Sequence, residues 1–398
     1  PAVSMQAEGR LLIIGEADVA LGWAERLAGP RTVTVLAPVA VDLPEEADFA
    51  VENGSNLRLA GHLGAFVASW QAAGELRHGT FDVVLDLSPK ALLNRVELPP
   101  GYIAPGRDPL DQALAVIDLL AFDGEFEKPR YVAVNERLCA HSRSQKAGCS
   151  NCIEVCATEA ITSAGDKVAL DPYLCQGCGT CTTVCPSGAL AFQYPRVADV
   201  GVAIKAQLKA YRAAGGENPC LLFHSAEAGK KELAMLKRAG GKLPANVIPV
   251  ETWSIDAVGL DLMLGAVALG ACQVALLGTG SHDLAPLHKQ AGLAQRILNG
   301  LGYAGDYVRI IAGGSDVFAA FADWVPAAAV PPAEFRLLAE KRTTLEFVVD
   351  HLLRHAPAAV SEAFCASRLA PSHWGAAFGT LPAATDFKTL LERAWPAA

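Results

Sequence analysis

Short apolar runs alternate with amphipathic stretches along most of the chain. The apolar run at residues 11–14 predicts a buried strand, residues 17–27 a helix, and residues 32–36 a second strand. Three later segments alternate apolar and polar positions and are predicted as half-buried antiparallel strands: residues 57–60, 65–70 and 81–87. A helix is predicted at residues 109–120. This part of the chain is therefore expected to be a small α/β scaffold with a β-hairpin region.

The second half of the chain alternates helical and strand patterns more regularly. Helices are predicted at residues 200–212, 228–239, 255–270 and 284–301. Strands are predicted at residues 220–224, 247–250, 272–277 and 307–311. Strands that alternate with helices of this length predict a parallel sheet covered on both faces. A long amphipathic helix is predicted at residues 333–355, before a tail rich in alanine and proline.

Composition narrows the class of protein. The chain has 398 residues, enough for two or three domains, with 52% hydrophobic and 19% charged residues and a net charge of −9. The negative charge argues against a broad nucleic-acid surface, which needs clustered Lys and Arg. The most hydrophobic stretch, residues 257–278, is interrupted by Asp261 and Gln273 and does not predict a membrane span. With no secretory pattern at residues 1–8, the protein is expected to be soluble and cytoplasmic.

Eight of the eleven cysteines fall between residues 139 and 185, in two related groups. Their spacings are Cys139-x9-Cys149-x2-Cys152-x3-Cys156 and Cys175-x2-Cys178-x2-Cys181-x3-Cys185-Pro186. The stretches at residues 156–161 and 185–190 repeat one half-motif, which indicates internal two-fold symmetry. Structural zinc sites are built from pairs of Cys-x2-Cys and need neither the third cysteine nor the trailing Cys-Pro. The spacing therefore favours iron-sulfur clusters over zinc, and metal over disulfides.

Residues from about 131 to 195 resemble the eight-iron ferredoxins of bacteria. In that motif the fourth cysteine of each run ligates the other cluster, so the resemblance implies two [4Fe-4S] clusters with crossed ligation. One cluster would be held by Cys139, Cys149, Cys152 and Cys185, here called cluster 1. The other would be held by Cys175, Cys178, Cys181 and Cys156, here called cluster 2. Two neighbouring clusters suit the transfer of single electrons.

The first half-motif departs from the usual pattern. Its first cysteine would normally stand at Lys146, whereas the nearest cysteine is Cys139, seven residues earlier. A loop of this length costs little extra closure entropy, so we expect Cys139 to ligate. His141 is an alternative ligand that would raise the cluster potential. The basic loop of His141, Arg143 and Lys146 would otherwise offset cluster charge, face an acidic partner or simply be solvated. The spacing leaves open whether one cluster is [3Fe-4S].

Residues 218–312 resemble the delta subunit of methyl-viologen-reducing hydrogenase, a domain also fused to some heterodisulfide reductase A subunits. The similar stretches are the strand before His224, residues 243–250 and residues 270–278. Residues 61–66, which precede the cysteines, are similar to a segment before the ferredoxin motifs of heterodisulfide reductase A subunits. The loops that carry cluster cysteines in those relatives have none here, and no third cluster is predicted. Cys220 and Cys272 fall within predicted strands, where buried structural thiols are the default.

Nucleotide binding is less favoured than cluster binding. Only Gly15 of a G-x-G-x-x-G fingerprint follows the first predicted strand, which argues against a dinucleotide or flavin site there. Residues 278–281 lie between a predicted strand and a helix, a place where α/β sheets bind anions. A flavin at one of these two places remains the alternative.

The predicted fold class is a multidomain α/β protein with a central ferredoxin-like α+β domain. The predicted domains are residues 1–127 (scaffold and connector), 128–197 (two-cluster ferredoxin), 198–328 (hydrogenase delta-like parallel-sheet domain) and 329–398 (helical tail). The predicted function is electron relay for a larger oxidoreductase, such as a formate dehydrogenase, hydrogenase or heterodisulfide-reductase-like complex, rather than catalysis by this chain alone. A flavin-containing oxidoreductase and a non-catalytic assembly or regulatory protein are the alternatives.

Overall fold

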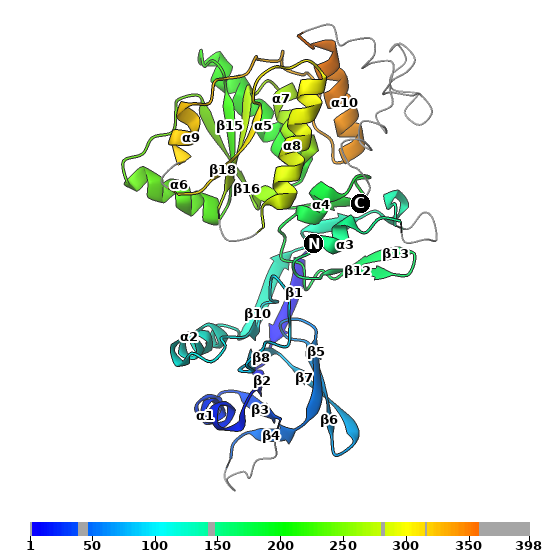
Figure 1. The fold of residues 1–398 in the computed structure, drawn as a ribbon, viewed down its shortest axis with the longest axis vertical. Helices are drawn as coiled ribbons and strands as arrows, with labels where there is room; N and C mark the ends of the chain where they lie inside the picture. Colours follow the sequence, from blue (N-terminus) through cyan, green and yellow to red (C-terminus); the bar gives the residue numbers. More distant parts are fainter. Residues whose placement is uncertain (1, 39–46, 142–147, 280–282, 315–316, 358–398) are drawn as a thin grey trace. The chain divides into compact units, whose positions relative to one another are not determined.

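A computed structural model describes residues 2–38, 47–141, 148–279, 283–314 and 317–357 (Figure 1). The chain forms two compact units, each made of two stretches. Unit 1 contains residues 1–131 and 156–176, and unit 2 contains residues 132–155 and 177–398. No helix among the described residues is both long and apolar enough to cross a membrane.

Unit 1 is built around a parallel sheet of five strands in the order β4-β3-β2-β8-β9. These strands are β2 Arg10–Ile14, β3 Thr32–Ala37, β4 Ala50–Asn53, β8 Val83–Asp86 and β9 Tyr102–Ile103. Leu11 and Ile13 of β2 face a layer that includes helices α1 (Ala17–Leu27) and α2 (Pro109–Leu120). Leu12 and Ile14 face the opposite layer, because successive side chains of a strand point to opposite faces.

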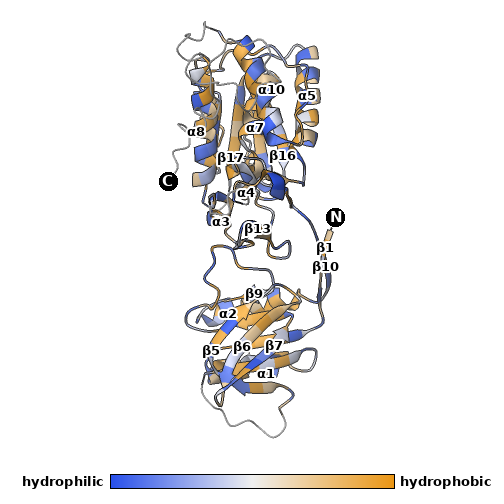
Figure 2. Ribbon diagram, turned by 90° about the vertical axis from the view of Figure 1, so that its right-hand side faces the viewer, coloured by the Kyte–Doolittle hydropathy of each residue, from blue (hydrophilic) through white to orange (hydrophobic). Residues whose placement is uncertain are grey.

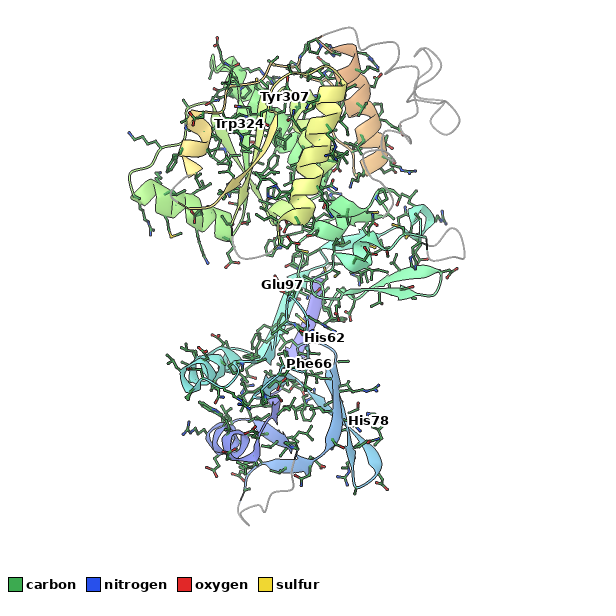
Figure 3. All side chains as sticks on the ribbon, in the orientation of Figure 1. His62, Phe66, His78, Glu97, Tyr307 and Trp324 are labelled. Carbon is green, nitrogen blue, oxygen red and sulfur yellow. The ribbon has the colours of Figure 1, made fainter. Side chains whose placement is uncertain are left out.

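That opposite layer is a three-stranded antiparallel sheet of β5 (Ser55–Ala60), β6 (Phe66–Ala72) and β7 (Glu75–Phe81). Phe66, Trp70 and Phe81 pack on the parallel sheet, and Phe66 is wholly buried (Figure 3). Unit 1 also contains two antiparallel strand pairs. They are β1 (Ala2–Ala7) with β10 (Gly124–Pro129), and β12 (Ile161–Ala164) with β13 (Lys167–Leu170).

Unit 2 contains a parallel sheet of four strands in the order β16-β15-β17-β18. They are β15 Cys220–Ser225, β16 Val247–Thr252, β17 Gln273–Gly278 and β18 Val308–Ala312, and β17 is largely orange in Figure 2. Leu221 and Phe223 face one core and Cys220 and Leu222 the other, so both faces of the sheet are covered. Every residue of helix α7, Leu260–Ala268, is buried.

The remaining elements of unit 2 surround this sheet or form the cysteine-rich region. The helices are α5 Val197–Ala213, α6 Ala228–Arg238, α8 Ala285–Gly300, α9 Ala319–Ala322, α10 Lys341–Arg354 and the short 3-10 helix η2 Ile255–Ala257. The cysteine-rich region contributes β11 Val132–Val134, η1 Glu136–Leu138, α3 Asn151–Glu154, α4 Thr180–Val184 and β14 Leu190–Phe192. Strands β11 and β14 pair antiparallel.

The structure corrects two predictions about these elements. The segment predicted as a half-buried antiparallel strand at residues 81–87 contains β8, which pairs parallel with β2 and is fully buried. Its unbroken run Val83-Val84-Leu85 is typical of a strand covered on both faces. The helix predicted at residues 333–355 begins only at Lys341. The Thr344 hydroxyl, in the first turn of this helix, accepts the backbone N–H of Leu338 and donates to the Leu338 carbonyl oxygen. Leu338 therefore lies in the non-helical segment that precedes the helix. Most of the predicted helical tail, residues 358–398, lies outside the described residues.

A buried carboxylate joins the ends of β1 and β2 to β8. Asp82 is wholly buried and accepts the backbone N–H groups of Glu8 (2.8 Å) and Arg10 (2.9 Å) as well as the Arg10 guanidinium. Burial opposes ionisation, but the bonds from Arg10 and Glu8 outweigh it and lower the pKa of Asp82. Because its pKa is depressed, Asp82 stabilises the fold at neutral pH, and this stabilisation is lost as the pH falls below about 4.

We therefore expect Asp82→Ala to destabilise this sheet by about 2–3 kcal/mol, because it leaves buried donors without an acceptor. Hydrogen exchange at β2 and β8, which reports local opening, measures this loss. The exposed Asp123 provides the matched control, and Asp123→Ala should change exchange little. Equal protection in the two variants would contradict the role given to Asp82.

Candidate iron-sulfur site

Four of the predicted cluster cysteines come together inside unit 2. Cys139 follows the 3-10 helix η1, and Cys185 follows α4. Cys149 precedes α3, and Cys152 is the second residue of α3. Helices α3 and α4 are in contact. The thiols of Cys185, Cys149 and Cys139 all act electrostatically on Cys152. These are the four residues predicted for cluster 1.

The electrostatics of Cys152 fit an iron ligand that is neutralised by metal. Burial, and then the neighbouring thiols of Cys185, Cys149 and Cys139, raise the pKa of Cys152 to about 12. Four thiolates gathered in this buried place would repel one another strongly. Bound iron would displace the thiol protons and supply the compensating positive charge, as metals do at thiolate sites in general. The donor set fits a cluster held by four cysteines.

Cys185 has a different environment from Cys152. Burial would raise its pKa, but the backbone of Leu190, the Ser187 hydroxyl and the positive charge of Lys341 together lower it. The ammonium of Lys341 donates to the carbonyl oxygens of Thr182 (3.1 Å), Thr183 (2.7 Å) and Cys185 (3.2 Å). Lys341 is the first residue of α10, so a helix 156 residues further along the chain holds the backbone of a predicted ligand.

Hydroxyl groups lie two residues after three of the cysteines. The sulfur of Cys156 lies 3.6 Å from the Thr158 hydroxyl, and that of Cys185 lies 3.6 Å from the Ser187 hydroxyl. These two pairs occupy equivalent places in the two half-motifs. The Thr180 hydroxyl donates to the sulfur of Cys178 at 3.6 Å. Hydrogen bonds to ligand sulfurs raise the reduction potential of a cluster, so both half-motifs carry a device of this kind.

His141 is buried and contacts the backbone of a predicted ligand. Its Nδ1 lies 2.8 Å from the carbonyl oxygen of Cys149, so this nitrogen carries the proton in the bond. The histidine predicted as an alternative ligand is thus hydrogen-bonded to the backbone of Cys149. The other basic residues of that loop, Arg143 and Lys146, lie outside the described residues.

The four cysteines predicted for cluster 2 divide between the units: Cys156 and Cys175 in unit 1, Cys178 and Cys181 in unit 2. In unit 1, Lys128 donates to the carbonyl oxygens of Tyr173 (2.5 Å) and Cys175 (2.9 Å). Burial lowers the pKa of Lys128, while the nearby Cys175 and Asp171 act to raise it.

Among the described residues, no group of three or more His, Cys, Asp or Glu side chains is placed to hold a single metal ion.

The second half-motif packs tightly against the rest of unit 2. Gly179 stands between Cys178 and α4 with a φ of +87°, a conformation that favours glycine. A side chain there would also lie 2.8 Å from the backbone of Ala257 in η2. We expect Gly179→Ala to lower iron content, measured on the purified protein. The matched control is Gly165→Ala, at a positive φ in open space, which should keep its iron.

The other predicted sites are not assembled in the same way. Cys220 and Cys272 are fully buried, and burial raises the pKa of Cys220 to about 12, as expected for structural thiols. Gly280 and Ser281 of the predicted anion loop lie outside the described residues. At the first strand–helix turn, a side chain on Gly15 would lie 2.9 Å from Cβ of Leu87. Asp18 adds negative charge to the first turn of α1, where a phosphate would need positive potential.

The lysine contacts and the hydroxyl pairs were missed by sequence reasoning. Ser187 and Thr158 carry a local signal, since both stand two residues after a cysteine in the repeated half-motif. Lys341 carries none, because its position in sequence gives no indication of the fold that brings it to Cys185.

Comparison with known proteins supports an iron-sulfur domain in this part of the chain. Residues 147–189 match the family described as the 4Fe-4S dicluster domain. A stretch of 41 residues is 39% identical to a protein named "Ferredoxin 7Fe" from Hydrogenibacillus schlegelii. The match covers 10% of this chain and 53% of that protein, so this chain spans about half the length of the curated relative. The chain therefore contains a 4Fe-4S ferredoxin-type domain, the kind of domain that serves iron-sulfur electron transfer.

Proposed function

We propose that this protein relays electrons through two [4Fe-4S] clusters to or from a larger oxidoreductase. The observation that carries the proposal is the convergence of Cys139, Cys149, Cys152 and Cys185 from two separate half-motifs. When bound, such a cluster takes up and releases one electron. The protein supplies the thiolates, the hydroxyls of Ser187 and Thr158, and the lysines that hold the ligand backbones.

The proposed partners are a formate dehydrogenase, a hydrogenase or a heterodisulfide-reductase-like complex. The sequence similarity of residues 243–250 and 270–278 to the hydrogenase delta subunit supports this choice. Residues 224–226 and 251–253 carry no cysteine, so residues 218–312 would serve as a docking scaffold. We do not extend the proposal to a flavin, because Asp18 places negative charge in the first turn of α1, where a phosphate would need positive potential.

Iron and acid-labile sulfide content, with EPR after anaerobic reduction by dithionite, tests the proposal. We expect about eight of each per chain and a spectrum of two interacting cubane clusters. Seven irons would mean that one cluster is [3Fe-4S]. Four irons, or zinc in their place, would contradict two-cluster binding.

A further inference from the structure

Helix α2 of unit 1 is apolar on two opposite faces. Its buried face contains the apolar residues Ala115, Val116 and Leu119 together with the polar Gln112. On the other side, Leu110, Leu114, Ile117 and Leu120 are 67%, 53%, 64% and 50% exposed. The positions 110, 114 and 117 recur every three or four residues and form one stripe. A surface helix normally presents polar residues to water, so an exposed apolar stripe of this kind indicates a binding surface.

A shallow groove of 440 Å³ runs beside this stripe. Leu114 and Ala115 of α2 form one side of it, and Leu98 and residues 102–105 form the other. Asp111 and Asp118 also line the groove, one helical repeat of seven residues apart on the same flank of the stripe. The groove thus combines an apolar floor with two carboxylates.

The groove is joined to the segments that carry two predicted ligands of cluster 2. The side-chain amide of Gln176, next to Cys175, donates to the carbonyl oxygen of Leu98 at 2.8 Å. The N–H of Glu97 donates to the carbonyl oxygen of Ala157, next to Cys156, at 3.2 Å (Figure 3 labels Glu97). A protein bound in the groove therefore contacts Leu98, whose backbone bonds directly to a neighbour of Cys175.

We propose that the α2 groove is a further docking site of the redox partner, in addition to residues 218–312, and that it receives an amphipathic helix carrying lysine or arginine beside its apolar stripe. This inference rests on the proposed electron relay and identifies where the partner binds. Residues 107–125 contain five acidic side chains and one basic side chain, Arg107, which pairs with Glu16. A partner helix with basic flanks complements this charge, which speeds association and fixes orientation.

A second copy of the chain is the less suitable occupant. A two-fold symmetric contact is made by the same patch on both molecules. Two α2 helices that met through their stripes would bring Asp111 and Asp118 of both copies together in an interface that excludes water. Like charges there are costly, and no basic residue between positions 108 and 125 offsets them.

The test uses the purified, cluster-containing full chain and a defined probe. The probe is a fluorescein-labelled amphipathic peptide of about five helical turns, with leucines spaced as one stripe and lysines beside it. Its matched counterpart has glutamate in place of every lysine. Fluorescence anisotropy should show saturable binding of the lysine peptide, weakened by salt, and at least tenfold weaker binding of the glutamate peptide.

Variants assign the binding to α2. The double variant Leu114→Ser/Ile117→Ser should bind the lysine peptide at least tenfold more weakly, because it removes the centre of the stripe. Asp111→Asn/Asp118→Asn should bind several-fold more weakly and lose salt dependence. Val202→Ser, at a position 51% exposed on α5, is the matched control and should bind like the native chain.

Three results would overturn the inference. They are equal binding of the two peptides, unchanged binding by the serine double variant, and a concentration-dependent dimer that this variant abolishes. Iron content separates this inference from the proposed function. The α2 variants should keep about eight irons, whereas a native chain without iron would refute the electron relay whatever the peptide does.

Discussion

The double variant Cys185→Ala/Cys152→Ala is expected to retain about four irons, whereas Cys185→Ala/Cys181→Ala is expected to retain almost none. Under crossed ligation, Cys185 and Cys152 serve the same cluster, so removing both costs no more than removing one. Cys185 and Cys181 are only four residues apart in sequence but serve different clusters, so their joint removal damages both. The pairing of Cys185 with Cys152 is supported by their proximity, since the Cys185 thiol, after burial, contributes to the raised pKa of Cys152.

The same two variants also test the uncrossed alternative, in which each run of four cysteines binds its own cluster. In that case the results would exchange: Cys185→Ala/Cys181→Ala would keep four irons, and Cys185→Ala/Cys152→Ala would lose both clusters. Cys220→Ala is the matched control, because it removes a buried thiol on β15 that is assigned to neither predicted cluster, and it should retain about eight irons. Iron, sulfide and EPR intensity are the measurements, on protein prepared anaerobically.

The helices and strands that were predicted correctly are those whose position depends on residues close together in the chain. Helix α2 lies at residues 109–120 as predicted, because Pro109 suits the first turn and Asp108 caps it with bonds to the N–H groups of Leu110 and Asp111. The four strands of the unit 2 sheet lie in the predicted segments for a similar reason. Each is a short apolar run between helical patterns, and the two central strands, β15 and β17, are buried along almost their whole length.

Pairing between distant segments could not be read from the sequence. Strand β7, Glu75–Phe81, was not predicted because six of its seven residues are outside the core and it contains Gly79. It forms because β6 offers it a backbone edge. Strands β1 and β10 pair across more than 110 residues, and β10 carries the mixed sequence Gly-Glu-Phe-Glu-Lys-Pro. In these cases backbone hydrogen bonds, rather than hydrophobic pattern, decide the structure.

The candidate site shows the same difference between features with a local sequence signal and contacts between distant segments. Cysteine spacing predicts ligands for both clusters, because the ferredoxin motif places most of its thiolates at short intervals, and this assignment stays a prediction. The groups that surround the ligands come from elsewhere: Lys341 from α10 and Lys128 from β10. Their contacts are made to backbone carbonyls, which every residue possesses, so no residue type at the cysteines indicates them.

Replacing Lys341 with methionine is expected to lower the midpoint potential of cluster 1 by roughly 40–80 mV. Lys341 places a positive charge against the carbonyl of Cys185, and a positive charge stabilises the more negative, reduced form of a cluster. A partly buried unit charge at this kind of separation is worth about 1–2 kcal/mol, and about 1.4 kcal/mol corresponds to 59 mV for one electron. The length of the methionine side chain preserves the packing of the lysine stem.

EPR-monitored redox titration measures this shift, and three further variants define its origin. Lys341→Arg retains the charge and should restore most of the potential. Arg342→Met removes the same charge one residue further on, at an exposed position, and should shift the potential much less. Lys128→Met should instead lower the potential of cluster 2, since Lys128 donates to the carbonyl of Cys175. Equal shifts for Lys341→Met and Arg342→Met, with eight irons retained, would show that overall charge rather than the contact with Cys185 sets the potential.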